Sequence, residues 1–164
     1  MHDYTRFTKR IAIKAPVNEI YNLWTTQEGL EKWLLRSAVF TSGDGHVRER
    51  TQPVQMGDTY AWTWFGWPEE VAEHGTITNT NGTRHFEFVF GKAGIVSIDI
   101  KEEHGETVLE LVQESIPTDE ESRWNYFIGC QTGWTFYLVN LKSILEGGLD
   151  LRNKSEALTN MTNS

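Results

Sequence analysis

The chain has 164 residues, with 23 acidic and 15 basic side chains and a formal net charge of −8. One domain is expected, because a chain of this length can bury enough apolar surface to fold alone. The acidic balance argues against a nucleic-acid partner, since phosphate binding depends on clustered Lys and Arg. No window approaches the roughly 18 to 20 continuous apolar residues of a membrane-spanning helix, so no membrane partner is predicted.

Cysteine content and the first residues bear on location. Cys130 is the only cysteine, so an internal disulfide is excluded. The opening residues MHDYTRFTKR lack the apolar run of a signal peptide. These two features predict a cytoplasmic protein.

The first third of the chain predicts one strand and two short helices. Residues 6–14, RFTKRIAIK, alternate apolar and polar side chains as a half-buried strand does. After Pro16, the segment VNEIYNLWTTQEGLEKWLL carries apolar residues at helical spacing, and Gly29 marks a break within it.

The middle of the chain, residues 38–114, predicts an antiparallel meander. Strand-like runs recur between Gly-rich or Asn-Gly turns, and the connections are too short for parallel crossovers. Asn81-Gly82 is a hairpin signal, because this pair accepts the positive φ angles of a tight turn. GIVSIDI and ETVLELVQ, joined across KEEHGE, form another predicted hairpin.

The last predicted element is a helix over residues 119–146, about 42 Å long at 1.5 Å per residue. Thr118 and Glu121 match a capping box, and Gly147-Gly148 supplies the stop. A helical projection places one apolar stripe towards the sheet: Phe127, Cys130, Trp134, Tyr137, Leu138, Leu141 and Leu145. Residues 1–152 are expected to form the domain and residues 153–164 a flexible tail.

Gly129 and Gly133 lie inside the expected helix, where each costs about 1 kcal/mol relative to Ala. The close approach of another backbone, or room beside Trp134, would compensate for this cost.

Three segments resemble a known family: APVNEIYNLWTTQEGLEKWL, TVLELVQESIP and GCQTGWTFYLVNLKSILEGGLDLR. Together they are similar to the Aha1-like branch of the START/Bet v 1 (SRPBCC) superfamily, over roughly residues 7 to 152. The resemblance implies an α+β helix-grip fold, in which a curved antiparallel sheet wraps around one long C-terminal helix. It further implies a stand-alone domain whose relatives often bind lipids, hormones or polyketides, and sometimes act as cyclases.

The aromatic content, with seven Trp, eight Phe and five Tyr, suggests a ligand cavity between sheet and helix. The cavity-lining residues predicted from the strand and helix periods are Trp62, Trp64, Phe86, Phe88, Phe90, Gln131, Trp134 and Leu138. Gln131 would orient a polar end of the ligand. An ordinary filled core explains the same aromatic rows equally well.

Signals for chemistry are weak. His2, His46, His74, His85 and His104 show no metal-ligand spacing, so neither a metal nor a cofactor is predicted. Cys130 has no visible base to activate it and reads as a small buried hydrophobe. The pair Glu69-Glu70 fits a solvated turn as well as it fits acid/base work.

Three functions follow, in this order. The first is non-catalytic binding of a small apolar molecule. The alternative is a protein-interaction module near Hsp90-type chaperones, which would show a filled core and an exposed patch. A cyclase or hydrolase comes third. Phe136 and Val139 project away from the apolar stripe, and we expect a second copy in a two-fold dimer, or the short helices, to cover them.

Overall fold

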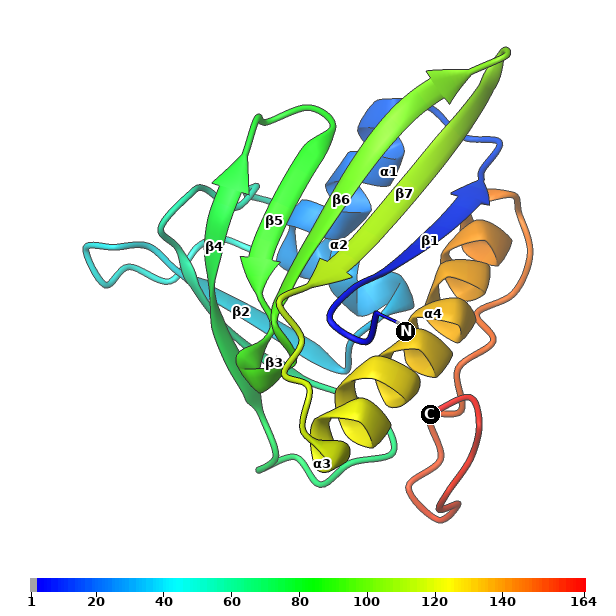
Figure 1. Cartoon of the computed structure of the whole chain (residues 1–164). Helices are drawn as coiled ribbons and strands as arrows, with labels where there is room; N and C mark the ends of the chain where they lie inside the picture. Colours follow the sequence, from blue (N-terminus) through cyan, green and yellow to red (C-terminus); the bar gives the residue numbers. More distant parts are fainter. Residues whose placement is uncertain (1–2) are drawn as a thin grey trace.

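The computed structural model describes residues 3–164, which are built around a seven-stranded antiparallel sheet (Figure 1). The strands lie in the order β1-β7-β6-β5-β4-β3-β2, so the first strand pairs with the last and the rest form a meander. Their bounds are β1 Phe7–Ala12, β2 Ser37–Thr41, β3 Thr59–Thr63, β4 Glu73–Thr80, β5 His85–Val89, β6 Ile95–Glu103 and β7 Glu106–Glu114. The predicted meander and both hairpins are confirmed.

The hairpin between β4 and β5 turns at Asn81 and Gly82. The side-chain oxygen of Asn81 accepts hydrogen bonds from the backbone amides of Thr83 and Arg84, two and three residues later. Gly82 has φ 76°, which explains why glycine suits this position. The pairing of β4 with β5 shifts register between Ile77 and Asn79.

Two short helices, α1 Val17–Thr25 and α2 Gln27–Trp33, follow β1 as predicted. The break between them lies at Thr26, which has an extended backbone and accepts the amide of Gly29 at 2.9 Å. The prediction that Gly29 marks the break is therefore wrong. Gly29 lies inside α2, where the backbone of α1 comes so close that a Cβ would collide with it.

The C-terminal helix runs as three consecutive segments. A short turn α3, Glu120–Ser122, leads into a π-helical segment η2, Arg123–Ile128, and then into α4, Gly129–Leu145. The predicted capping box of Thr118 and Glu121 is wrong, because Asp119 caps the helix by accepting the amide of Ser122 at 3.0 Å. A π-helical turn inside an α-helix often marks a functional site.

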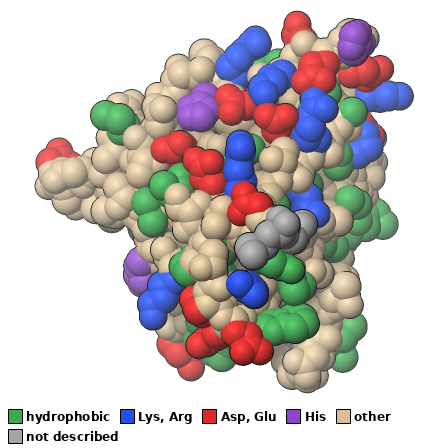
Figure 2. Space-filling model, viewed as in Figure 1, with side chains coloured by type: hydrophobic (Ala, Val, Ile, Leu, Met, Phe, Trp, Pro, Cys, Tyr) green, Lys and Arg blue, Asp and Glu red, His purple; other side chains and the backbone are tan. Residues whose placement is uncertain are grey.

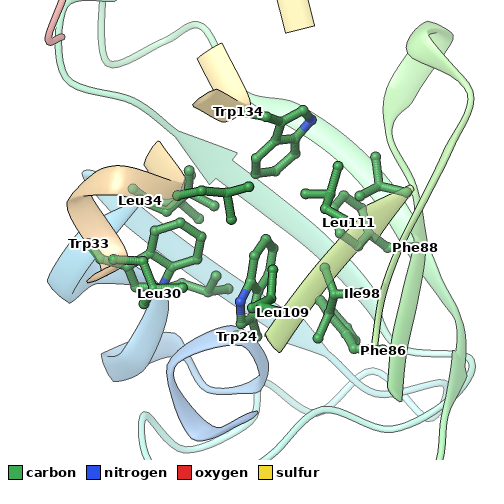
Figure 3. Close-up of a cluster of buried hydrophobic side chains, with 14 of the residues drawn as sticks. Trp24, Leu30, Trp33, Leu34, Phe86, Phe88, Ile98, Leu109, Leu111 and Trp134 are labelled. Carbon is green, nitrogen blue, oxygen red and sulfur yellow. The ribbon is translucent and has the colours of Figure 1, made fainter. Parts of the chain in front are cut away.

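The core fills the space between the concave face of the sheet and the helices (Figure 3). Trp24 and Trp33, from α1 and α2, pack edge-to-face with ring centroids 4.6 Å apart. Trp24 also lies 5.8 Å from the ring of Trp134 on α4. The predicted stripe on α4 faces this core, with Trp134, Leu138 and Leu141 buried.

The outer face of β1, β6 and β7 carries charges of both signs (Figure 2). Arg10 pairs with Glu103 and Glu110, and Lys101 pairs with Glu110 at 2.8 Å. Because basic side chains here alternate with acidic partners, they form no continuous basic surface. Within residues 3–164, no helix has the length and apolar character needed to cross a membrane.

After α4 the chain turns back along this helix, where the side-chain oxygen of Asn140 accepts the amide of Leu151 at 2.7 Å. The side chain of Arg152 is buried and ends at the carbonyl groups of α2 and the turn after it. Residues 153–164 contain neither helix nor strand, and Ser164 lies against Gly66. The flexibility of this tail stays a prediction.

Candidate functional site

A cavity of about 750 Å³ opens at one end of the sheet, between the loop after β3, the end of β5 and the start of the C-terminal helix. We call it the mouth cavity. Its lining residues are Trp64, Trp67, Val71, Ala72, Glu73, Phe90, Gly91, Lys92, Ala93, Trp124, Asn125, Tyr126, Gly129 and Cys130. The wall is dominated by aromatic rings, with few charged groups.

An inner pocket of about 150 Å³ continues the mouth cavity towards the core, because both spaces share Trp64, Phe90 and Cys130. Asn125 and Gly129 are shared as well, and Leu34, Gly133, Trp134 and Tyr137 complete the lining of this inner pocket. A Cβ added to Gly133 would meet nothing within 4 Å, and one added to Gly129 would meet only the carbonyl oxygen of Trp124. Of the two predicted explanations for these glycines, the structure therefore favours room beside Trp134 over the close approach of another element's backbone.

Two aromatic rows of the sheet lead from the core to the mouth cavity. The alternation in β3 places Tyr60, Trp62 and Trp64 on one face, and the first two are buried whereas Trp64 is half-buried. The neighbouring row follows the same rule, with Phe88 buried and Phe90 half-buried. The last ring of each row passes beyond its strand, and the rings of Trp64 and Phe90 meet there 6.1 Å apart.

The structure divides the eight predicted cavity residues into two groups. Trp64, Phe90 and Trp134 line the mouth cavity or the inner pocket. Trp62, Phe86, Phe88 and Leu138 are buried at 0% to 3% exposure in the packed core, and neither space is lined by them or by Gln131. Ring contacts fill the space where the sequence predicted a cavity. The ring of Trp62 stacks on that of Tyr60 at 4.0 Å and lies 5.0 Å from that of Phe88.

Gln113 supports this site and was missed in the sequence. It lies on β7, is completely buried, and accepts the indole N–H of Trp134 at 2.9 Å. Its amide nitrogen donates to the carbonyl oxygen of Ala93 at 2.9 Å, in the 3₁₀ turn Gly91–Ala93 that forms one wall of the mouth cavity. A signal was present, because Leu109, Leu111 and Gln113 share the inward face and only the last is polar.

Burial favours the neutral form of one thiol and two phenols in and beside the cavity. Burial raises the pKa of the Cys130 thiol, and the carboxylate of Glu73 raises it further, although a hydrogen bond with Gln113 acts in the opposite direction. Burial likewise raises the pKa of Tyr137 to about 12 and that of Tyr60 well above its usual value. The thiol is half-buried on the cavity wall and packs against the core, so it is less buried than the sequence predicted.

The other candidate groups lie away from the cavity. His85 contacts Asp99 at 3.0 Å on the outer side of the sheet. His46 and His74 are exposed, His104 lies in the turn between β6 and β7, and His2 lies outside the described residues. Glu69 is exposed and pairs with Arg36 at 3.6 Å. Across residues 3–164, no three His, Cys, Asp or Glu side chains gather in a metal-binding arrangement.

The outer side of α4 was expected to be covered. Phe136 is half-buried and contacts the ring of Tyr137 at 5.1 Å, whereas Val139 is 47% exposed. Coverage by a second copy stays a prediction.

A curved antiparallel sheet closed by a C-terminal helix, with an aromatic cavity at the helix start, defines a helix-grip domain of the START/Bet v 1 class. Residues 14–146 match the model of the family described as "Activator of Hsp90 ATPase homolog 1-like protein", and the chain belongs to this family. No match was found among curated proteins.

Solved structures with the same fold come from several bacteria. A protein of Staphylococcus saprophyticus is 18% identical, with a TM-score of 0.68 over 90% of this chain and 96% of its own. The Aha1 dimer from Colwellia psychrerythraea is 21% identical, with a TM-score of 0.64 over 87% and 97% of the two chains. CalU16 from Micromonospora echinospora is 18% identical, with a TM-score of 0.64 over 88% and 76%. At these identities the likeness shows the fold alone.

Proposed function

We propose that this protein binds a small hydrophobic molecule, without chemical conversion, in the mouth cavity and the inner pocket behind it. The observation that carries this proposal is the pair of half-buried rings, Trp64 and Phe90, at the ends of two otherwise buried rows. They face a space of about 750 Å³, within the usual range of ligand sites. A ring in this position gains from burial by a ligand, because its apolar surface still contacts water.

Two further features support a binding role without catalysis. Gly129 and Gly133 leave room on a helix that Ala would stabilise. The protein therefore keeps this space at a cost in stability, and ligand binding explains why. The raised pKa of the Cys130 thiol keeps it protonated, which makes it a poor nucleophile. We also propose a cytoplasmic location, because the single cysteine needs no oxidising compartment.

The test is isothermal titration of the protein with a panel of apolar compounds such as flavonoids and fatty acids. We expect saturable binding of at least one compound to the unmodified protein. Gly133→Leu fills the inner pocket and should weaken that binding by about tenfold or more. Thr132→Leu adds the same side chain at an exposed position of the same helix and should leave it unchanged. Equal weakening by both variants, or no saturable binding, would contradict the proposal.

The second candidate, a protein-interaction module acting with an Hsp90-type chaperone, has one specific observation in its favour. Trp67 and Trp124 on the rim are 60% and 64% exposed, as hot-spot residues of an unoccupied interface would be. Trp124→Ser should abolish binding to a purified Hsp90-type chaperone under this candidate, while Gly133→Leu should not. The reverse pattern, with small-molecule binding lost in Gly133→Leu, supports the first candidate.

A further inference from the structure

One wall of the mouth cavity carries a carboxylate whose position is fixed by the backbone. Glu73 is the first residue of β4, is half-buried, and lines the cavity. Its carboxylate lies over Gly91, where a Cβ would collide with it. Gly91 also has φ 50°, so both the nearby carboxylate and the backbone conformation favour glycine at this position. The turn Gly91–Ala93 thus leaves a place for the carboxylate at the cavity wall.

This carboxylate has no counter-ion in the described chain. Within residues 3–164, no Lys, Arg or His nitrogen lies within 4.0 Å of Glu73, and its hydrogen bond is a long one of 3.3 Å from the amide of His74. Lys92 also lines the cavity but is exposed and lies beyond ion-pair distance. A half-buried carboxylate gains more from a cation than an exposed one does, because less water competes for it.

The field of Glu73 reaches the interior of the site. Its negative charge contributes to the raised pKa of Cys130 on the cavity wall and of Tyr60 in the core behind it. An anionic head group in the mouth cavity, between Glu73 and Cys130, would meet the same repulsion. The net charge of −8 also attracts cations to the molecule and disfavours anions.

The rest of the wall suits an organic cation. Trp64, Trp67, Phe90, Trp124 and Tyr126 all line the mouth cavity. The face of an aromatic ring attracts a cation within about 6 Å, most strongly in Trp, and this attraction grows when water is excluded. Aromatic rings with one unpaired carboxylate form a set that binds alkylammonium groups better than inorganic ions, which need several oxygen ligands.

Resting on the proposed function, we propose that the bound molecule is an organic ammonium compound, with its cationic head beside Glu73 and its apolar body in the inner pocket below Trp64 and Phe90. The shared lining of the two spaces allows one elongated molecule to occupy both. The head then exchanges water for a carboxylate and ring faces, while the body contacts Trp134 and Tyr137.

Three probes of matched length test the proposal by isothermal titration: phenylbutylamine, which is cationic at neutral pH, the neutral phenylbutanol, and the anionic phenylbutanoate. We expect the unmodified protein to bind the amine about tenfold more tightly than the alcohol, and the acid most weakly. Glu73→Gln should remove the advantage of the amine and leave the affinity for the alcohol unchanged.

Lys92→Gln is the matched control, because it removes the other charge of the lining. It should retain or increase affinity for the amine, and it keeps the test decisive if Glu73→Gln folds poorly by circular dichroism. Equal or tighter binding of the alcohol or the acid would overturn the ammonium proposal while leaving cavity binding intact. If none of the three probes binds and no compound of the apolar panel binds saturably, both the ammonium proposal and the proposed cavity binding are overturned.

Discussion

Gln113 shows how one buried polar side chain holds the site in shape. Its amide group joins β7 to α4 through the Trp134 indole and to the wall of the mouth cavity through the carbonyl of Ala93. A buried amide is stable only while both ends are paired, and here both ends are. Loss of this side chain therefore affects stability and the geometry of the cavity together.

We predict that Gln113→Leu lowers the free energy of unfolding by about 3 kcal/mol, because it leaves two buried groups unpaired at about 1 to 3 kcal/mol each. Urea denaturation measures this. Gln52→Leu makes the same exchange at an exposed position and should change stability by less than about 0.5 kcal/mol. In a double-mutant cycle with Trp134→Phe, which lacks the N–H donor, the double variant should lose less stability than the sum of the two single losses. Strict additivity would show that the hydrogen bond contributes nothing.

At the scale of the element, α4 contains residues that leave room for the cavities and lower the stability of the helix. Gly129 follows directly on the π-helical segment Arg123–Ile128, and Gly133 comes one helical turn later. The segment and both glycines face the cavities. The segment carries Trp124, Asn125 and Tyr126 to the mouth cavity. The helix start thus combines several features that an optimally stable helix would avoid.

We predict that Gly133→Ala raises the free energy of unfolding by about 1 kcal/mol, because Ala is the better helix former and its Cβ meets nothing within 4 Å. Chemical denaturation followed by circular dichroism at 222 nm, the helix band, measures the change. Gly129→Ala is the comparison, and it should gain less, because its Cβ would lie 3.4 Å from the carbonyl oxygen of Trp124. A loss of stability in Gly133→Ala would mean that the helix bends here in a way that only glycine permits.

The elements could be predicted from the sequence, because their signals are local. Alternation gave the faces of β3 and β5, and the apolar stripe gave the buried side of α4. The place of the cavity could not be predicted, since it depends on where two strands end relative to a helix that is distant in sequence. Rings at the middle of each row therefore fill the core, and only the last rings, Trp64 and Phe90, reach the mouth cavity.

Glu73 escaped prediction for a separate reason. The alternation of residues 73–80 is irregular, because the pairing of β4 with β5 shifts register between Ile77 and Asn79. The pattern therefore gave no phase from which to assign Glu73 to the inner face. Its significance arises only when Gly91, eighteen positions later, lies beneath its carboxylate.

At the scale of the whole molecule, one buried arginine joins the segment after α4 to α2 and the turn that follows it. Arg152 has a side chain that is 2% exposed and pairs with Asp150 at 2.7 Å. Its guanidinium also donates to the carbonyl oxygens of Leu35, Glu31 and Lys32 at 2.8 to 3.0 Å. These carbonyls lie in and just after α2, so one side chain fixes the segment after α4 against the opposite part of the fold.

We predict that Arg152→Met lowers the free energy of unfolding by about 3 kcal/mol, because it removes the buried cation from Asp150 and leaves three carbonyl groups without their side-chain donor. Lys154→Met removes the second cation from the same carboxylate, but Lys154 is 51% exposed and its loss should cost less than about 1 kcal/mol. Thermal and urea denaturation of both variants make the comparison. Similar losses in the two would show that the buried contacts of Arg152 add nothing to a surface ion pair.

The pH dependence of stability tests the same contact in the unmodified protein. Burial alone would raise the pKa of Asp150, but hydrogen bonds from Arg152 and Lys154 outweigh it and hold the pKa far below its usual value. A carboxyl group with a lowered pKa stabilises the fold at every pH above its unfolded value near 4, and this stabilisation is lost as the pH falls below that value. The free energy of unfolding should therefore decline between about pH 4 and pH 2 more steeply in the unmodified protein than in Arg152→Met. Equal slopes in this range would show that the pair of Asp150 and Arg152 does not stabilise the fold.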